Sequence, residues 1–327
     1  MEVTTPAKAR SFLAKAGWGD ASIEPLAGDA SFRRYFRVRK GERCAMLMHA
    51  PPPNEDPEPF LRAAKWLDSN KLRAPVILAE DMSSGLVLLQ DFGEVRMREY
   101  VDAWPQDAET VYRVAIDTLL DLHQLPPGPF TQYTLAEYQR EAKLFIDWYC
   151  PAQGLYIDGP SWTEAWAEAL GSLLSRQRPG VTVLRDYHAE NIMLLGGLEK
   201  QGLLDFQDAL VGHPAYDLVS LLQDARRDVD TALEQAMLDY YIERSGAQSE
   251  FLADYARLGA QRNAKIIGIF VRLWKRDGKP RYLDYIPRVW RLLERDLAHP
   301  ALAPVARWFD THISPELRAA GGGHLAK

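Results

Sequence analysis

Two short segments in the second half of the chain carry side chains that suit phosphoryl transfer. In the first, 184–191, Asp186 lies on a predicted loop and Asn191 follows five positions later; in the second, 203–208, Asp205 ends an apolar run. Phosphoryl transfer to a hydroxyl needs a carboxylate that orients or accepts that hydroxyl, and oxygen ligands that hold Mg²⁺ against nucleotide phosphates. We therefore predict that Asp186 is the catalytic carboxylate and that Asn191 and Asp205 bind Mg²⁺.

Predicted strands around these segments make the assignment more specific than one residue could. A single Asp-x-x-x-x-Asn match is common, and a lone aspartate on a turn usually serves the turn itself. Here an apolar strand at 181–184 precedes Asp186, and two apolar strands, 192–195 and 202–204, separate Asn191 from Asp205. This alternation of strand and polar loop favours one shared site over three unrelated turns.

Further polar residues around the loop are candidates for contact with the acceptor. His188 is predicted to brace the loop by hydrogen bonds rather than act as a base, with substrate contact as the alternative. The helix that starts after Gly212 places Asp217 and Asp224 on one face. Asp217 suits the positive end of that helix, and bracing the catalytic loop is its alternative role. The predicted acceptor contacts are His188, Asp208, Asp224, Arg226 and Arg262.

The triplet Asp91-Phe92-Gly93 has the form of the metal-binding motif of protein kinases, but it lies far upstream of Asp186. The metal-binding aspartate should follow the catalytic loop, as Asp205 does. We therefore predict that Gln90 and Asp91 form the crossover between two lobes, where the backbone meets the adenine edge of a nucleotide.

Nucleotide phosphates also need a cation, and the predicted strand 44–49 contains no lysine. The turn at 28–34 is the alternative, because it contains a glycine and ends in two arginines. Side chains alternate along a strand, so Arg33 and Arg34 point to opposite faces and at most one faces the phosphates. The sequence leaves open which one does. The predicted nucleotide contacts in this turn are Ser31, Phe32, Arg33 and Arg34.

The hydrophobic periodicity changes near residue 92. Before it, alternating segments predict a hairpin at 31–38 and 44–49 and strands at 76–78 and 86–89, with a helix at 60–69. After it, helical spacing dominates, for example at 108–125, at 135–149 and from 214 onward. We predict an α+β protein with a small antiparallel β lobe over 1–91, a larger helical lobe over 92–320 and a disordered tail over 321–327.

Composition excludes several classes of protein. The chain has 327 residues, 47% of them hydrophobic, and a net charge of −6, which argues against a nucleic-acid binder. The N-terminal segment lacks an apolar run after a basic start, and the apolar run 266–271 is too short to span a bilayer. Two cysteines far apart favour a reducing compartment. We expect a cytoplasmic protein without a nucleic-acid, membrane or obligate protein partner.

The acceptor is predicted to be small. Only about a dozen residues separate Asp205 from the helix at Asp217, which leaves no room for the activation loop that a protein kinase uses.

The run from Asp186 to Asn191, followed by Asp205, resembles the motifs of the aminoglycoside phosphotransferase superfamily. That superfamily shares the bilobal protein-kinase-like fold. Its usual His-Gly before the aspartate is Leu184-Arg185 here. Segments 30–35, 47–52, 205–209 and 215–227 are in addition similar to the bacterial anomeric kinases of N-acetylmuramate and N-acetylglucosamine, so the resemblance covers nearly the whole chain.

This resemblance implies ATP- and Mg²⁺-dependent phosphorylation of the anomeric hydroxyl of an amino sugar, to the sugar 1-phosphate, in cell-wall (peptidoglycan) recycling. The lactyl carboxylate of N-acetylmuramate would suit an arginine or lysine, and the candidates are Arg226, Arg262, Arg272 and Lys275. Two alternatives stay open. One is a kinase for an aminoglycoside, choline or an amino alcohol; the other is a catalytically inactive kinase-like binding module, which the missing lysine favours. The preferred sugar, the reacting anomer and the oligomeric state are not determined by the sequence.

Overall fold

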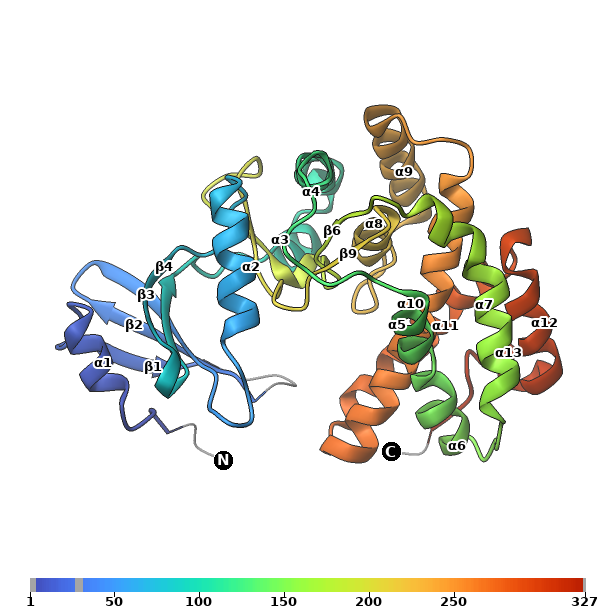
Figure 1. Ribbon diagram of the computed structural model, residues 1–327, viewed down its shortest axis with the longest axis horizontal. Coiled ribbons are helices and arrows are strands. Elements are labelled where there is room, and N and C mark those ends of the chain that lie inside the picture. The colour runs from blue at the N-terminus through green and yellow to red at the C-terminus, as the bar shows by residue number, and fades with distance from the viewer. Residues whose placement is uncertain (1–3, 27–31, 326–327) are drawn as a thin grey trace. The chain divides into compact units, whose positions relative to one another are not determined.

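A computed structural model describes residues 4–26 and 32–325, which form two compact units (Figure 1). The first comprises Met1–Val114 with Ala189–Ala209, and the second comprises Ala115–His188 with Leu210–Lys327. The predicted lobes meet at residue 91, whereas packing assigns the later segment 189–209 to the first unit. It does so because the Leu203 N–H donates to the carbonyl of Arg73, 2.8 Å away, and Phe206 stacks on Phe60.

The first unit is built on a five-stranded antiparallel sheet with the strand order β1-β2-β3-β5-β4. The predicted hairpin is confirmed: β2 and β3 pair directly, and Gly41 takes the positive φ of 57° that their tight turn needs. The strands are β1 (Ser22–Pro25), β2 (Arg34–Lys40), β3 (Arg43–His49), β4 (Ile77–Asp81) and β5 (Leu86–Gln90). The other elements are α1 (Ala9–Lys15), α2 (Glu58–Ser69), α3 (Met97–Ala103), the start of α4 (Ala108–Gln124), β7 (Ile192–Leu194) and β8 (Gln201–Leu203).

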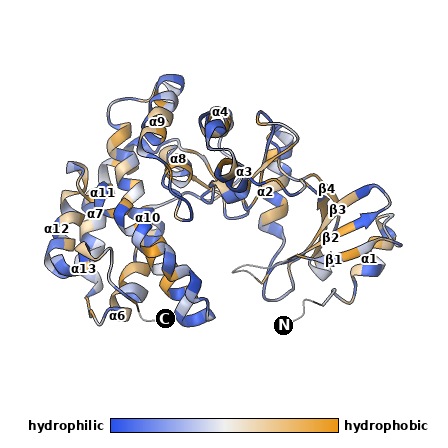
Figure 2. Cartoon of the chain, turned by 180° about the vertical axis from the view of Figure 1, so that it is seen from behind, coloured by the Kyte–Doolittle hydropathy of each residue, from blue (hydrophilic) through white to orange (hydrophobic). Residues whose placement is uncertain are grey.

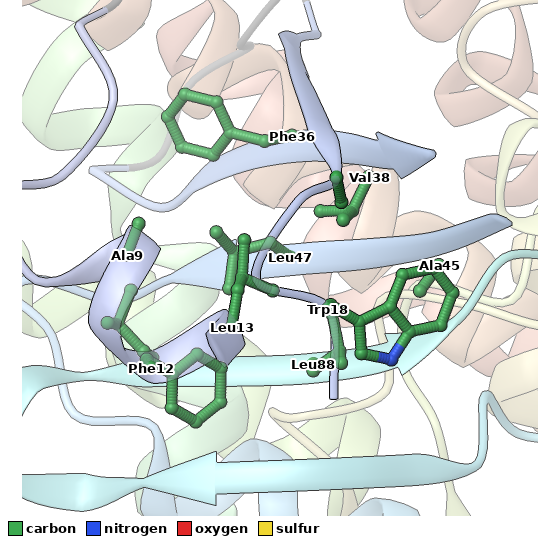
Figure 3. Packing of buried hydrophobic residues seen from close by; sticks show 11 residues of the cluster. Ala9, Phe12, Leu13, Trp18, Phe36, Val38, Ala45, Leu47 and Leu88 are labelled. Carbon is green, nitrogen blue, oxygen red and sulfur yellow. The ribbon is translucent and has the colours of Figure 1, made fainter. Parts of the chain in front are cut away.

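Alternation along the strands gives the sheet two different faces. One face is apolar and packs on α1, with Phe36, Leu47 and Leu88 fully buried against Phe12 and Leu13 (Figure 3). Figure 2 shows the hydrophobic residues along these strands. The residues that alternate with these buried ones along the strands point to the opposite face. This second face carries Tyr35, Arg37, Met46 and Met48, and in the register Tyr35 lies opposite Met48 and Arg37 opposite Met46.

The second unit is helical around α10 (Phe251–Asp277), the longest helix described. Gly268 lets α10 approach the chain at Leu144, because a Cβ there would lie 2.3 Å from a backbone atom of that residue. The helices are the remainder of α4, α5 (Leu135–Ala142), a π-helical turn (Phe145–Tyr149), α6 (Cys150–Ala152), α7 (Gly159–Arg176), α8 (Ala215–Leu222), α9 (Thr231–Ser245), α10, α11 (Ile286–Leu297), α12 (Ala303–His312) and α13 (Pro315–Ala319). A two-stranded sheet pairs β6 (Val181–Val183) with β9 (Leu210–Gly212).

The small antiparallel sheet and the helical unit confirm the predicted α+β class. Some details differ from the sequence prediction. The helix expected at 135–149 ends at Ala142 and is followed by the π-helical turn. Within the expected tail, the carbonyl of Gly322 accepts hydrogen bonds from Tyr149 and Gln153, each 2.7 Å long. Among the residues described, no helix is long and apolar enough to cross a membrane.

Candidate active site

Asn191 and Asp205 meet in the first unit at the ends of the β7–β8 hairpin. β7 starts directly after Asn191, and β8 ends two residues before Asp205. The Leu204 N–H donates to the carbonyl of Asn191 at 2.9 Å, which closes the hairpin, and the Asn191 side-chain amide donates to Asp205 Oδ2 at 3.3 Å. The hairpin therefore brings together the two residues predicted to bind Mg²⁺.

Asp205 has a backbone conformation that few residues other than glycine adopt. Its φ is +58°, which is in the left-handed region that aspartate tolerates better than most side chains. The Gln207 side chain donates to Asp205 Oδ1 at 2.8 Å and fixes the carboxylate, which is exposed. The strained backbone presents the carboxylate at the end of the strand, as an ion-binding role requires.

The two side chains fit a magnesium ion. Mg²⁺ prefers oxygen ligands, and it usually takes one or two protein side chains and completes its shell with substrate phosphates and water. Within the described part of the chain, no group of three or more His, Cys, Asp or Glu side chains is placed to hold a metal. The pair thus suits an ion that a nucleotide helps to bind, not a closed site made of protein alone.

Asp91 of the upstream Asp-Phe-Gly triplet has a structural partner. Its carboxylate forms an ion pair with Arg37 Nε at 2.7 Å and accepts the Gly93 N–H at 2.8 Å. Phe92 fills the space above Gly202 of β8, where a Cβ would lie 2.5 Å from its ring. The triplet therefore joins the sheet to the β7–β8 hairpin, and its carboxylate is used by Arg37. Contact of the Gln90 and Asp91 backbone with a nucleotide stays a prediction.

The second face of the sheet distinguishes the two arginines of the predicted phosphate turn. Arg33 precedes β2 and pairs with Glu55, Nε to Oε2, at 3.3 Å. Burial raises the pKa of Tyr35 to about 12, with Arg33 opposing the rise and Asp205 adding to it, so Tyr35 lies within the electrostatic range of both Arg33 and Asp205. Arg34 is exposed and lies opposite His49 on the neighbouring strand.

Which of the two arginines faces the phosphates stays a prediction. Arg33 shares the face of Tyr35 by strand alternation, and Met48 stands opposite Tyr35 on the neighbouring strand. Ser31 lies outside the described residues, and Phe32 is 67% exposed.

In the second unit, Asp217 fixes the loop that carries Asp186. Asp217 Oδ2 accepts the Leu184 N–H at 2.6 Å, and its Oδ1 accepts the Arg185 N–H at 2.7 Å. Arg185 has a φ of +73°, an unfavourable conformation for a long side chain that these two bonds hold. Asp217 is fully buried at the start of α8, and its hydrogen bonds brace the loop. This is the alternative role that the sequence analysis gave for it.

Asp186 lies in a strongly positive environment. Burial alone raises the pKa of Asp186, but Lys265, His188, Arg262 and Arg185 together bring it below its ordinary value. The carboxylate is therefore ionised at neutral pH and can accept a hydrogen bond from a hydroxyl. This is the state that the predicted catalytic role requires.

His188 joins most of the predicted acceptor contacts into one cluster. Arg226 Nη1 donates to His188 Nε2 at 3.1 Å, and the Arg226 N–H donates to Asp224 Oδ1 at 2.8 Å. Burial lowers the pKa of His188 to about 4, so the ring is neutral and accepts this bond. Charges on Asp224, Arg226, Asp186 and Arg262 all influence it. Asp208 is exposed on a turn of the first unit, and its contact with the acceptor stays a prediction.

The sequence analysis missed a buried charge network beside Asp186. Glu141 of α5 accepts hydrogen bonds from Tyr133 and Arg185 and pairs with Lys265 Nζ of α10 at 3.0 Å. Lys265 also donates to the Tyr216 hydroxyl at 3.2 Å, and it is the strongest charge acting to lower the Asp186 pKa. No sequence motif marks Glu141 or Lys265. The only signal in the sequence is that each is a charged residue at a helix position where the hydrophobic pattern predicts a core residue.

Residues 22–260 match the phosphotransferase enzyme family. The N-acetylmuramate/N-acetylglucosamine kinase of Caulobacter vibrioides is 36% identical, over 94% of this chain and 96% of the relative. The kinase of the same name from Pseudomonas aeruginosa is 38% identical over 88% of each chain.

Solved structures share the fold at much lower identity. The streptomycin–ATP complex of the aminoglycoside phosphotransferase APH(2")-IIa has a TM-score of 0.61 at 14% identity and covers 90% of this chain and 97% of its own. The choline kinase LicA from Streptococcus pneumoniae has a TM-score of 0.60, also at 14% identity, over 90% of this chain and 98% of its own. These likenesses confirm the kinase-like fold.

Proposed function

The chain belongs to the phosphotransferase enzyme family, and from that premise we propose that it transfers the γ-phosphoryl group of ATP to the anomeric hydroxyl of N-acetylmuramate or N-acetylglucosamine. The observation that carries the proposal is the ionised Asp186 on a loop pinned by Asp217. The identity of 36–38% with two kinases of these sugars, over most of both chains, supports the choice of acceptor.

In the proposed reaction, the acceptor hydroxyl donates a hydrogen bond to Asp186, which turns its oxygen toward the phosphoryl group. An anomeric hydroxyl is more acidic than an ordinary alcohol, so orientation matters more than deprotonation. Asn191 and Asp205 would hold Mg²⁺, which neutralises phosphate charge when bound. Because the phosphoryl donor is ATP, we also propose that the protein works in the cytoplasm.

The charges around Asp186 distinguish the proposed acceptor from its rivals. Aminoglycosides, choline and amino alcohols are cations, and the charges that lower the Asp186 pKa are themselves positive, Lys265 foremost. A cationic acceptor would be repelled there, whereas a neutral or acidic sugar would not. An inactive binding module is disfavoured for another reason, since Asp186 is held ionised and the Asn191–Asp205 pair is complete.

A panel of acceptors with Mg²⁺ and ATP tests the proposed function. We expect turnover of N-acetylmuramate or N-acetylglucosamine, and a phosphorus NMR spectrum of the product should have the signal of a glycosyl phosphate. Kanamycin and choline serve as the cationic acceptors, and nucleotide binding is measured alongside. Turnover of choline or kanamycin without the sugars would contradict the proposal, and nucleotide binding without any turnover would favour the inactive module.

We further propose that Arg33 supplies the cation for the nucleotide phosphates in place of the missing strand lysine. Replacing Arg33 by glutamine should raise the KM for ATP by roughly 10- to 100-fold, the range for losing a hydrogen bond to a charged group. Steady-state kinetics at saturating sugar measure this.

The control is Arg39→Gln, which removes an exposed arginine from β2, the strand that follows Arg33. It should leave the KM for ATP within about twofold, as surface substitutions usually do. If Arg34→Gln raised the KM more than Arg33→Gln, the assignment of the two faces would be reversed.

A further inference from the structure

Cationic residues recur along one face of α10, the long orange helix of Figure 1. Lys265, Arg272 and Arg276 are separated by seven and four positions. At about 3.6 residues per turn, these spacings place all three side chains within a narrow sector of the helix. Since Lys265 is the main charge acting on Asp186, this face begins beside the proposed catalytic carboxylate.

Most cations near this face have a partner within the protein. Lys265 pairs with Glu141, Arg262 Nη2 donates to Ser220 Oγ at 2.7 Å, and Arg276 pairs with Asp277 at 2.7 Å. Arg226, on the loop after α8, donates to His188. Each of these groups is already held in place, so none is the natural first contact for an incoming anion.

Arg272 is different. Among the residues described it has no hydrogen bond or ion pair, although it is half-buried and its Nε is enclosed. Burial lowers its pKa, and the charges of Arg276 and Arg140 lower it further, with Asp277 opposing them. A half-buried guanidinium among other cations is unfavourable unless an anion joins it. Glu137 does not supply this anion, because its carboxylate already pairs with Arg140.

The position of Arg272 suits an acid that is attached to the acceptor. Two helical turns, or roughly 10 Å of axial rise, separate it from Lys265. Side chains of a helix lean toward its N-terminus, so Arg272 and Lys265 lean the same way and keep this separation along the axis. A sugar whose hydroxyl meets Asp186 can extend an acidic side group in this direction.

We propose that Arg272 binds a carboxylate carried by the acceptor and thereby favours N-acetylmuramate, which has a lactyl acid, over N-acetylglucosamine, which has none. This inference rests on the proposed function. A guanidinium binds a carboxylate through two parallel hydrogen bonds, and bound acid would also neutralise the repulsion among the cations at this end of α10.

The test compares kcat/KM for the two sugars in wild type and in Arg272→Gln. We expect the value for N-acetylmuramate to fall roughly 10- to 100-fold, the loss of a charge-assisted contact, while that for N-acetylglucosamine changes by less than about twofold. Arg272→Lys should restore only part of the preference for N-acetylmuramate. Lysine keeps the positive charge but cannot form the two parallel hydrogen bonds of a guanidinium. Arg276→Gln, four positions further on, is the matched control and should leave the ratio unchanged.

Melting temperatures keep the result interpretable. If Arg272→Gln unfolds, Arg272→Lys supplies the comparison, with a reduced preference for N-acetylmuramate expected. An unchanged ratio of the two kcat/KM values, or an equal fall for both sugars, overturns the role of Arg272. Failure of the wild-type protein to phosphorylate either sugar is a separate result, and it overturns the proposed function on which this role rests.

Discussion

Asp186→Asn should lower kcat by roughly 10²- to 10⁴-fold, the range for losing a positioned carboxylate that acts on a proton in the transition state. Asparagine keeps the shape of the side chain but removes the charge that Lys265 and Arg262 stabilise. Single-turnover and steady-state assays with the sugar acceptor measure the effect.

Asp121→Asn, an exposed carboxylate of α4, is the control and should retain wild-type kcat. Both variants should bind Mg·ATP as wild type does, since Asp186 acts on the acceptor. If Asp186→Asn kept kcat within about tenfold of wild type, a loss below ~1.4 kcal/mol, the catalytic assignment would be wrong.

The pH dependence of the same reaction follows from the lowered pKa of Asp186. The folded protein holds the proton of this carboxyl less tightly than the unfolded chain, whose value is near 3.8. The ionised state, and the stability that it contributes, is therefore complete above that value and is lost as the pH falls through the lower folded pKa. We expect the Asp186 limb of the kcat/KM profile to lie below pH 4 or so, outside the range from 5 to 8 in which activity is usually measured.

Asp205→Asn should raise the Mg²⁺ concentration for half-maximal turnover by about tenfold or more and lower kcat by roughly 10²-fold, because an amide is a weaker ligand for a hard cation than a carboxylate. Titration of Mg²⁺ at fixed ATP measures both quantities. The Asn191 amide would still be present, so part of the binding should remain.

Asp91→Asn is the informative comparison, because Asp91 belongs to the triplet that has the form of the kinase metal motif. Its carboxylate pairs with Arg37, so this variant should lower the melting temperature and leave the Mg²⁺ midpoint unchanged. The opposite pattern, with a shifted midpoint in Asp91→Asn and none in Asp205→Asn, would reassign the metal site to the triplet.

Several features could be predicted because they depend on residues that are close in the chain. Two-residue alternation marked the β2–β3 hairpin, and helical spacing marked α2 and α4. The strands next to these polar residues pointed to Asp186, Asn191 and Asp205, and the β7–β8 hairpin does join the last two. The triplet at 91–93 was set aside by chain order, and the ion pair of Asp91 agrees with that interpretation.

Other features depend on contacts between distant segments and could not be predicted. Alternation shows that Arg33 and Arg34 face opposite ways and that Arg33 shares the face of Tyr35, but only the tertiary structure shows that Glu55 pairs with Arg33 and that Asp205 acts on Tyr35. Lys265 and Glu141 are 124 positions apart and carry no motif, yet their ion pair lies beside Asp186.

The sequence by itself determined the kind of chemistry, because the order of strand, aspartate and asparagine is local and leaves a readable pattern. The tertiary structure decided the charge state and surroundings of Asp186, because these depend on α10 bringing Lys265 and Arg262 to it. It also distinguished Arg272 from the other arginines of α10, since only the placed side chains show that it lacks a partner among the described residues.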